Sequence, residues 1–294
     1  MKSNASLTKN AAHAAVSYRR SASSVVLRVL TVGAAVVTSC ILFFLIGYIL
    51  VKGLPHLTPE LFSPKFTTEN NSLLPALINT VFMTVLSLLM AVPLGIGAAV
   101  YMTEYARRGS RLVRIVRMAA ETLSGIPSIV YGLFGYLCFV VTLHFGYSLL
   151  AGACTLTIMV LPLIMRTTEE ALISVPDSFR EGSFGLGAGR LRTVMKIVLP
   201  AAVPGILSGV ILAIGRIVGE TAALIYTSGT YTEICTDLMQ SGRTLSVHMY
   251  SLSREGLYID QAYATAVVLL ILVVGINALS SLVAHKISSR AQGK

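Results

Sequence analysis

Hydrophobic residues gather in long uncharged runs, separated by short segments rich in arginine and lysine. The runs extend over residues 29–51, 73–103, 122–165, 197–215 and 261–284. A helix that crosses a bilayer needs about 20 apolar residues, so the third run is long enough for two helices, divided near residues 144–147. The pattern predicts an all-α polytopic membrane protein with six transmembrane helices. Arg216 and Glu220 interrupt the fifth of them.

The composition agrees with this pattern. Hydrophobic residues make up 54% of the chain and charged residues 12%, which is about half the charged share of a soluble domain. A soluble core cannot bury that much apolar surface. The residues before Cys40 resemble a lipoprotein cleavage site, but the apolar run continues to Val51. We therefore expect an uncleaved first span and not a signal peptide.

Basic residues mark the orientation. They lie in the N-terminal tail, after the second span, after the fourth span and in the C-terminal tail, as Lys2, Lys9, Arg19, Arg20, Arg28, Arg107, Arg108, Arg111, Arg114, Arg117, Arg166, Arg180, Arg190, Arg192, Lys196, Lys286, Arg290 and Lys294. The alternate loops carry only Lys52, Lys65, Arg243 and Arg254. Cytoplasmic loops are the basic ones, so both termini are predicted to be cytoplasmic. This asymmetry and contact with anionic lipid explain the net charge of +10 without a nucleic-acid partner.

Catalytic and metal-binding patterns are missing from the sequence. It contains no Gly-x-x-x-x-Gly-Lys-Ser/Thr segment, so we expect no ATP site in this chain. The histidines are scattered without metal-ligand spacing, and each is expected at an interface or in a loop: His13, His56, His144, His248 and His285. Three of the four cysteines lie in predicted spans, and Cys235 stands alone in an outer loop. The chain is therefore predicted to be no enzyme and to carry no cofactor.

Two ionisable residues in the fifth span are candidates for function. An ionised side chain in the middle of a membrane helix costs about 2.5–3.5 kcal/mol. Arg216 and Glu220 are four positions apart, which places them on one face of a helix where their charges can neutralise each other. Two interpretations follow: a salt bridge near the outer surface, or a cationic site for an anion with Glu220 positioning the guanidinium. Gly215 and Gly219 favour the second, because they indicate tight packing inside a bundle.

A segment between Pro176 and Pro200 is typical of a docking element on the cytoplasmic side. Pro176 suits the first turn of a short helix, and Gly187 suits its end. Phe179, Ser183 and Leu186 are expected on one face of that helix. A second short helix at the membrane surface is predicted to follow. Its hydrophobic face consists of Leu191, Val194, Met195 and Val198, and its basic side chains are Arg190, Arg192 and Lys196.

The same segment resembles a known family. Glu181-Gly182-Ser183, three residues, Gly187, nine residues, Ile197, one residue and Leu199-Pro200 are similar to the coupling motif of type I ABC-importer permeases. The resemblance implies that the ATPase-contacting residues are Phe179, Glu181, Gly182, Ser183, Leu186, Gly187, Ile197, Leu199 and Pro200. The usual Glu-Ala-Ala reads Glu-Gly-Ser here, with the spacing intact. The alternative is an ordinary amphipathic loop between two spans.

Three further segments resemble the permease subunits of phosphate importers, the PstA family. They are Pro127–Gly135, Arg166–Leu172 and Gly215–Ala222. The resemblance implies a phosphate path that includes Arg216, Glu220 and Arg166, although Arg166 is equally well explained as a basic anchor at the cytoplasmic end of the fourth span. Ala223 departs from the proline more usual in that family, which affects where the helix ends. Gly132 and Gly135 are expected to serve packing.

The resemblance also implies a function and partners. The chain would be an inner-membrane permease that moves inorganic phosphate inward by alternating access. Its partners would be a second homologous permease, an ATPase dimer that binds ATP and Mg²⁺, and an extracytoplasmic phosphate-binding protein that meets outer loops including 226–260. A permease for another oxyanion or small solute is the nearest alternative. A membrane scaffold or sensor, and an embedded enzyme, are more distant ones.

The predicted domain boundaries follow from these runs. Residues 1–24 form a cytoplasmic tail, and residues 25–72 the first transmembrane helix with its outer loop. Residues 73–284 form the permease domain with a cytoplasmic coupling helix, and residues 285–294 a second cytoplasmic tail.

Overall fold

The computed structural model describes residues 22–107 and 109–291, and the described part is helical, without strands. The predicted N-terminal tail lies almost wholly outside the described residues. The chain divides into two compact units, residues 1–49 and residues 50–294. Each unit is described by itself.

The first unit contains most of helix α2 (Ala22–Gly53). Its candidate span, Val25–His56, has none of its most apolar window buried. Phe43 and Phe44 are 71% and 69% exposed. Such a helix is stable only where its surroundings are apolar as well, which agrees with the predicted first transmembrane span.

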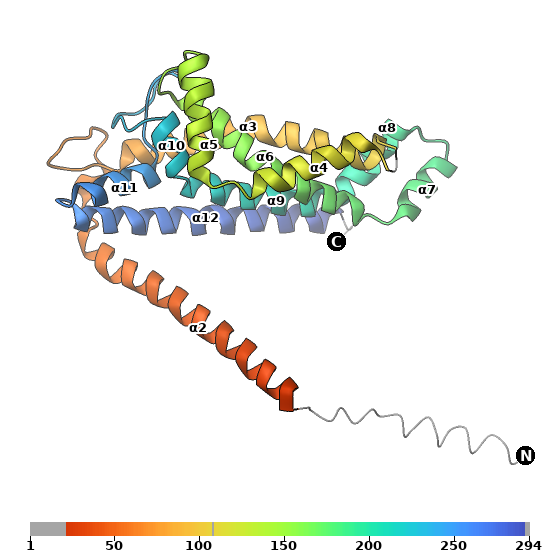
Figure 1. Cartoon of the computed structure of the whole chain (residues 1–294), viewed down its shortest axis with the longest axis horizontal. Coiled ribbons are helices and arrows are strands. Elements are labelled where there is room, and N and C mark those ends of the chain that lie inside the picture. The colour runs from red at the N-terminus through yellow and green to blue at the C-terminus, as the bar shows by residue number, and fades with distance from the viewer. Residues whose placement is uncertain (1–21, 108, 292–294) are drawn as a thin grey trace, which may run out of the picture. The chain divides into compact units, whose positions relative to one another are not determined.

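The second unit is a bundle of helices (Figure 1). Its helices, apart from three that join them, are α3 (Leu74–Val100), α4 (Arg111–Ser124), α5 (Ser128–Gly135), α6 (Leu149–Ile173), α9 (Leu199–Gly219), α11 (Leu245–Glu255) and α12 (Ile259–Ala291). The three others are α7 (Asp177–Gly185), α8 (Arg190–Thr193) and α10 (Ala222–Thr227). Helices α7 and α8 lie at one end of the bundle, and α10 and α11 lie at the other (Figure 1).

Helix α6 is the centre of the bundle. Two-thirds of its most apolar window is buried, and it packs against both α3 and α9. Small residues permit this close packing. A Cβ atom on Gly95 of α3 would lie 2.8 Å from Ile164, and one on Gly205 of α9 would lie 2.6 Å from Ala171. Larger side chains at these glycines would push both neighbours away from α6.

The third span is broken, which the sequence pattern did not predict. Arg111–Ser124 and Ser128–Thr142 together are apolar enough to cross a membrane, but they meet at an angle of 105°. The break follows from Pro127, which lacks an N–H and directly precedes α5. Five other helices are long and apolar enough to cross a membrane, so the expected total of six holds when the bent pair counts as one span.

The fifth span begins earlier than predicted. A separate surface helix was expected before it, but helix runs without interruption from Arg190 to Gly219, through a π-helical turn at Val194–Val198. Val198 is fully buried in a cluster with Met102 and Leu172. This packing draws the helix into the bundle from Arg190 onward, so the expectation of a separate surface helix was wrong.

Candidate functional site

Helix α7 ends as the glycine pattern predicted. Gly187 has a φ of +81°, a left-handed conformation that favours glycine. Its N–H donates to the carbonyl of Phe184 at 2.9 Å, and the N–H of Ala188 donates to the carbonyl of Ser183 at 3.1 Å. This pair of bonds is the Schellman arrangement, which satisfies carbonyls that would otherwise have no partner at the helix end. Gly187 therefore fixes the direction in which the chain leaves α7.

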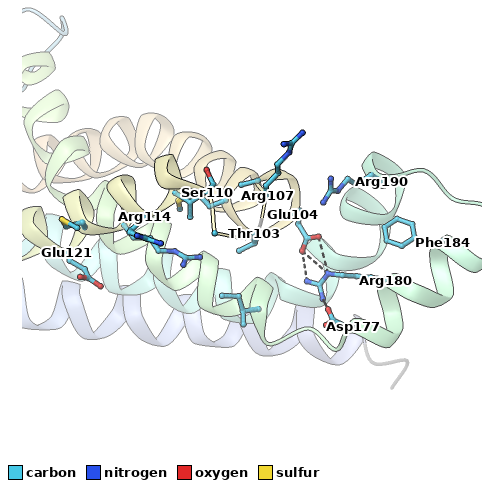
Figure 2. A pocket seen from close by; sticks show the side chains of 17 residues that line it. Thr103, Glu104, Arg107, Ser110, Arg114, Glu121, Asp177, Arg180, Phe184 and Arg190 are labelled. Atoms are coloured by element: carbon cyan, nitrogen blue, oxygen red, sulfur yellow. Dashed lines mark hydrogen bonds and ion pairs between the residues drawn. The ribbon is translucent and has the colours of Figure 1, made fainter.

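Arg180 ties α7 to the bundle, and the sequence reasoning missed its role. Its guanidinium forms an ion pair with Glu104 at 2.7 Å, donates to the carbonyls of Val175 and Leu172 at 2.7 Å and 2.9 Å, and reaches Asp177 at 3.1 Å (Figure 2). The hydrogen bond with Glu104 raises the pKa of Arg180 above its usual value. The partner carboxylate lies 76 residues earlier, so no local pattern could have revealed the pair.

The exposed face of α7 differs from the predicted one. Ser183 is buried, and its hydroxyl lies 2.8 Å from that of Thr193 in α8. Phe179, Phe184 and Leu186 are exposed instead, with Leu186 at 91%. Ser183 therefore fastens α7 to α8, while large apolar side chains point away from the chain's own core. Ser183 therefore does not share the exposure of Phe179 and Leu186, with which the sequence pattern groups it on one face.

A basic cavity of about 820 Å³ lies between the end of α3, α4 and α7 (Figure 2). Its charged walls are Arg107, Arg114, Arg117, Arg180, Arg190, Glu104, Glu121 and Asp177. Arg117 forms an ion pair with Glu169 of α6, and Arg190 lies over the ring of Tyr105 at 5.4 Å. Among the described residues, Arg114 has no ion-pair partner. The cavity thus keeps an excess of positive charge beside α7.

Arg216 and Glu220 do not form the ion pair that was expected. Helix α9 ends at Gly219, and Glu220 has extended backbone angles. Its Oε1 accepts hydrogen bonds from the N–H groups of Thr221 and Ala223, each at 3.2 Å, and so caps the start of α10. Among the described residues no ion pair joins Arg216 to Glu220. The residue at 223 matters here, because proline would remove one of these two N–H groups.

Arg216 is half-buried near the outer end of α9, where its charge acts on Tyr131 of α5. No described residue accepts a hydrogen bond from its side chain. If the two flanking glycines, Gly215 and Gly219, carried a Cβ, it would have no atom within 4 Å in the described part of the chain beyond their own helix backbone and chain neighbours. The tight packing expected around them is absent within this chain. By contrast, Gly132 and Gly135 do serve packing, with a Cβ on Gly132 falling 2.8 Å from Ala223.

Arg166 lies on α6 and not on α9 or α10, the helices that carry and follow Arg216. It is exposed on α6 and pairs with Glu170 one turn later, at 3.0 Å. The motif residues Ile197, Leu199 and Pro200 belong to the continuous helix of the fifth span, whereas Glu181 and Gly182 are exposed on α7. Within the described residues, no cluster of His, Cys, Asp and Glu could hold a metal ion.

The fold and this site together define a class of protein: a multi-pass membrane subunit with a short helix, α7, at one end and, among the described residues, a cation without an ion pair within a span. Comparison with known proteins agrees. The chain belongs to the family of binding-protein-dependent transport system inner membrane components, whose model matches residues 91–292. It is therefore a permease subunit of the inner membrane, of the ABC transporter type.

Several individual relatives are permease proteins of ABC transporters or of phosphate transport systems. The chain is 34% identical to the probable ABC transporter permease protein YqgI of Bacillus subtilis, over 77% of this chain and 82% of the relative. It is 37% identical to the phosphate transport system permease protein PstA of Mycobacterium leprae, over 69% and 67%. It is 36% identical to PstA of Yersinia pestis, over 78% and 79%.

Solved structures support the fold. The permease of a bacterial ABC transporter involved in the import of alginate matches with a TM-score of 0.66 and 17% identity, covering 90% of this chain and 98% of that one. A chain of the MetNI methionine ABC transporter, in an inward-facing conformation, matches with a TM-score of 0.60 and 22% identity, over 71% and 93%. These likenesses establish a type I importer permease fold.

Proposed function

We propose that this chain is the permease subunit of an ATP-driven importer for inorganic phosphate and forms half of the path by alternating access. The observation that carries the proposal is Arg216, a half-buried guanidinium inside a span with no anionic partner among the described residues. A charge in that position is expensive and marks an ion path more often than a structural contact. The relatives named as phosphate permeases supply the substrate class.

The chemistry of Arg216 suits phosphate. A guanidinium presents paired N–H donors that match two oxygens of one phosphate group. Glu220 supports this site indirectly, because its Oε1 holds the break between α9 and α10 just beyond Arg216. Its second oxygen is left for the P–O–H group that phosphate keeps near neutral pH. We place Arg166 at the cytoplasmic end of the same path, where its pairing with Glu170 also allows a purely structural role.

The energy source is proposed to be a separate ATPase dimer that binds ATP and Mg²⁺. Helix α7 is the proposed coupling helix, and its exposed side chains Phe179, Phe184 and Leu186 are the surface that would enter the ATPase. Exposed apolar side chains grouped in this way mark protein interfaces. Arg180 and Gly187 would set the angle at which α7 presents them.

A second permease subunit is proposed to cover the open face of α9. Leu212 on this helix is 60% exposed, and the two glycines beside Arg216 have free space around them. A neighbour in that position would complete the path around Arg216. An extracytoplasmic phosphate-binding protein would meet the outer loops. We infer this arrangement because the family is binding-protein-dependent.

Phosphate uptake tests the function. A strain that lacks this chain should regain uptake of labelled phosphate with the wild-type chain and lose it with Arg216→Gln, at equal membrane level and equal recovery of the ATPase. Arg166→Gln is the matched control for loss of a charge and should lower uptake less. Restored uptake of another oxyanion or solute, without phosphate uptake, would select the alternative permease.

A further inference from the structure

A second cavity lies at the end of the bundle opposite α7. It measures about 520 Å³ and lies between the loop before α3 and the segment that joins α10 to α12. The first wall contributes Phe66, Thr68 and Asn71, and the second contributes residues that include Thr232, Arg243, Arg254, Glu255 and Tyr258. The distribution of basic residues along the chain places both walls on the extracytoplasmic side.

Arg243 is a buried cation without an ion pair among the described residues, and the carboxylate whose charge acts on it is that of Glu255 in the same cavity. The residue is 6% exposed, and its guanidinium lies over the ring of Phe66 at 4.6 Å. Its Nη2 atom is buried and makes no hydrogen bond, and no described carboxylate forms an ion pair with it. Burial lowers the pKa of Arg243 to about 10, so the side chain is still charged at neutral pH. Buried charges are normally paired, because an unpaired one costs several kcal/mol.

The backbone around Arg243 holds this cation in place. The N–H of Arg243 donates to the carbonyl of Tyr231 at 2.9 Å, and its own carbonyl accepts from Asn79 of α3 at 3.4 Å. These bonds fix the backbone of Arg243, and the guanidinium itself is held by its contact with the ring of Phe66 on the opposite wall. A fixed, desolvated guanidinium is a prepared anion site.

His248 cannot neutralise or supplement this charge. It is fully buried in α11, in an edge-on contact with Phe66, which corrects the expectation of an interfacial or loop histidine. Burial and the nearby charge of Arg243 lower the pKa of His248 to about 3. The ring is therefore neutral at physiological pH. The positive charge of the cavity comes from Arg243 and, at its rim, the exposed Arg254.

We propose that this outer cavity binds inorganic phosphate before it enters the membrane, with Arg243 as its principal ligand. The choice of phosphate among oxyanions rests on the proposed function. Arg254 adds a second positive charge, and the carboxylate of Glu255 accepts a hydrogen bond from the P–O–H group. Ile225 of α10 lines the same cavity, and α10 is the helix capped by Glu220 beyond Arg216. The site thus precedes Arg216 on the way inward.

Glu255 decides between phosphate and other anions. A carboxylate wall repels sulfate and protein carboxylates, which are acceptors only at neutral pH. Hydrogen phosphate differs because its P–O–H group can donate a hydrogen bond to Glu255. The hydroxyl groups of Thr68, Thr232 and Tyr258 line the cavity and can donate or accept as the ligand requires. A free, protonated oxyanion fits these walls better than the side chain of a docking protein.

Thiol protection at Thr232 tests this site separately from Arg216. Right-side-out membrane vesicles would carry the assembled complex without its binding protein and without an energy source. Thr232→Cys, on the cavity wall, would be labelled with a membrane-impermeant thiol reagent, and Ser253→Cys, exposed outside the cavity, is the matched control. Native cysteines give the background, which is measured on the parent complex.

Saturating phosphate should slow labelling of Thr232→Cys about tenfold, as expected for a ligand held by charge-assisted hydrogen bonds. Sulfate should not slow it, and labelling of Ser253→Cys should not change with either ion. Adding Arg243→Gln should remove the protection, and Glu255→Gln should extend it to sulfate. Labelling of Thr232→Cys that ignores phosphate, or protection that survives Arg243→Gln, would overturn the proposal.

Two further arms keep the test decisive. If Arg243→Gln fails to reach the membrane, Arg254→Gln takes its place and should raise the phosphate concentration for half-protection about tenfold. An unchanged concentration for half-protection would count against the site.

Protection should persist in Arg216→Gln, which lacks uptake. If uptake assays instead assign another solute to the complex while phosphate still protects Thr232→Cys, the proposed function fails and the outer site stands.

Discussion

Arg180 at the cytoplasmic end and Arg243 at the outer end are both largely shielded from solvent, yet their surroundings differ. The side chain of Arg180 is 16% exposed and is saturated by two carboxylates and two carbonyls. Arg243 is 6% exposed and has an aromatic ring but no carboxylate within ion-pair distance among the described residues. A guanidinium whose donors are all satisfied holds two elements together. One that keeps free donors attracts an anion.

The largest expected effect belongs to the saturated arginine. Arg180→Gln leaves Glu104 buried without its partner, which should destabilise this end by about 3–5 kcal/mol. We expect a lower thermal midpoint of the purified complex and poor recovery of the ATPase. The double variant Arg180→Gln with Glu104→Gln, which removes both charges, should recover part of the midpoint.

Arg190→Gln is the matched control for this prediction. Arg190 also lines the cytoplasmic cavity, but it is exposed, its guanidinium lies over the ring of Tyr105, and it forms no ion pair among the described residues. Its loss should cost about 1 kcal/mol or less. Equal midpoints for Arg180→Gln and Arg190→Gln would remove the distinction between a saturated anchor and an ordinary surface arginine.

Acid should weaken the outer end more than the cytoplasmic end. The pKa of His248 falls from 6.5 to about 3 on folding, so the unfolded chain binds the proton more readily than the folded chain. Stability is therefore lost as pH drops below about 6.5, by about 2 kcal/mol at pH 5. Thermal unfolding of the complex at pH 7.5 and pH 5 measures this loss. His248→Leu should flatten the dependence, and an equally steep dependence in that variant would assign the loss to other groups.

A smaller effect is expected at the end of α7. Gly187→Ala places a Cβ on a residue with a φ of +81°, which costs about 1 kcal/mol. No atom lies within 4 Å of the new Cβ, so the cost is conformational and not steric. Uptake and ATPase recovery should fall modestly, and further with Gly187→Val. Gly97→Ala, inside α3 with equally open space and outside the predicted ATPase-contacting residues, should leave both unchanged. Normal coupling in Gly187→Val would separate this turn from the docking role.

The comparison assumes that the two ends face opposite sides of the membrane, and labelling tests this without altering stability. Leu186→Cys should react with an impermeant thiol reagent only after the membrane is opened, because α7 is predicted to be cytoplasmic. Ser253→Cys should react in sealed right-side-out vesicles. Reaction of both residues from the same side would show that the orientation inferred from the basic loops is wrong.

The sequence predicted features that depend on local chemistry. The apolar runs located the spans, and Gly187 marked the end of α7, because chain reversal after a helix demands a residue that tolerates positive φ. The missing N–H of Pro127 also indicates a helix break, but the long apolar run around it favours a continuous span, so the break was not predicted.

Contacts between residues far apart in the sequence could not be predicted from local patterns. Arg180 pairs with Glu104, which lies 76 positions away in the sequence. Glu220 accepts hydrogen bonds from N–H groups at the start of α10 and forms no ion pair with Arg216. Arg243 was read as one of a few charges in an outer loop. Only packing against Phe66, from a loop far away in sequence, shows that it is buried. Periodicity gives the face of a helix but not the neighbour that covers it.

The unbroken helix from Arg190 to Gly219 has a mechanical consequence. Its 30 residues span about 45 Å, and it begins beside α7, to which Ser183 and Thr193 fasten it. Arg216 lies near its far end. A tilt of α7 on an ATPase would therefore reach the guanidinium through one continuous helix, and that helix would bend first at the π-helical turn at Val194–Val198 and at the proline at position 204.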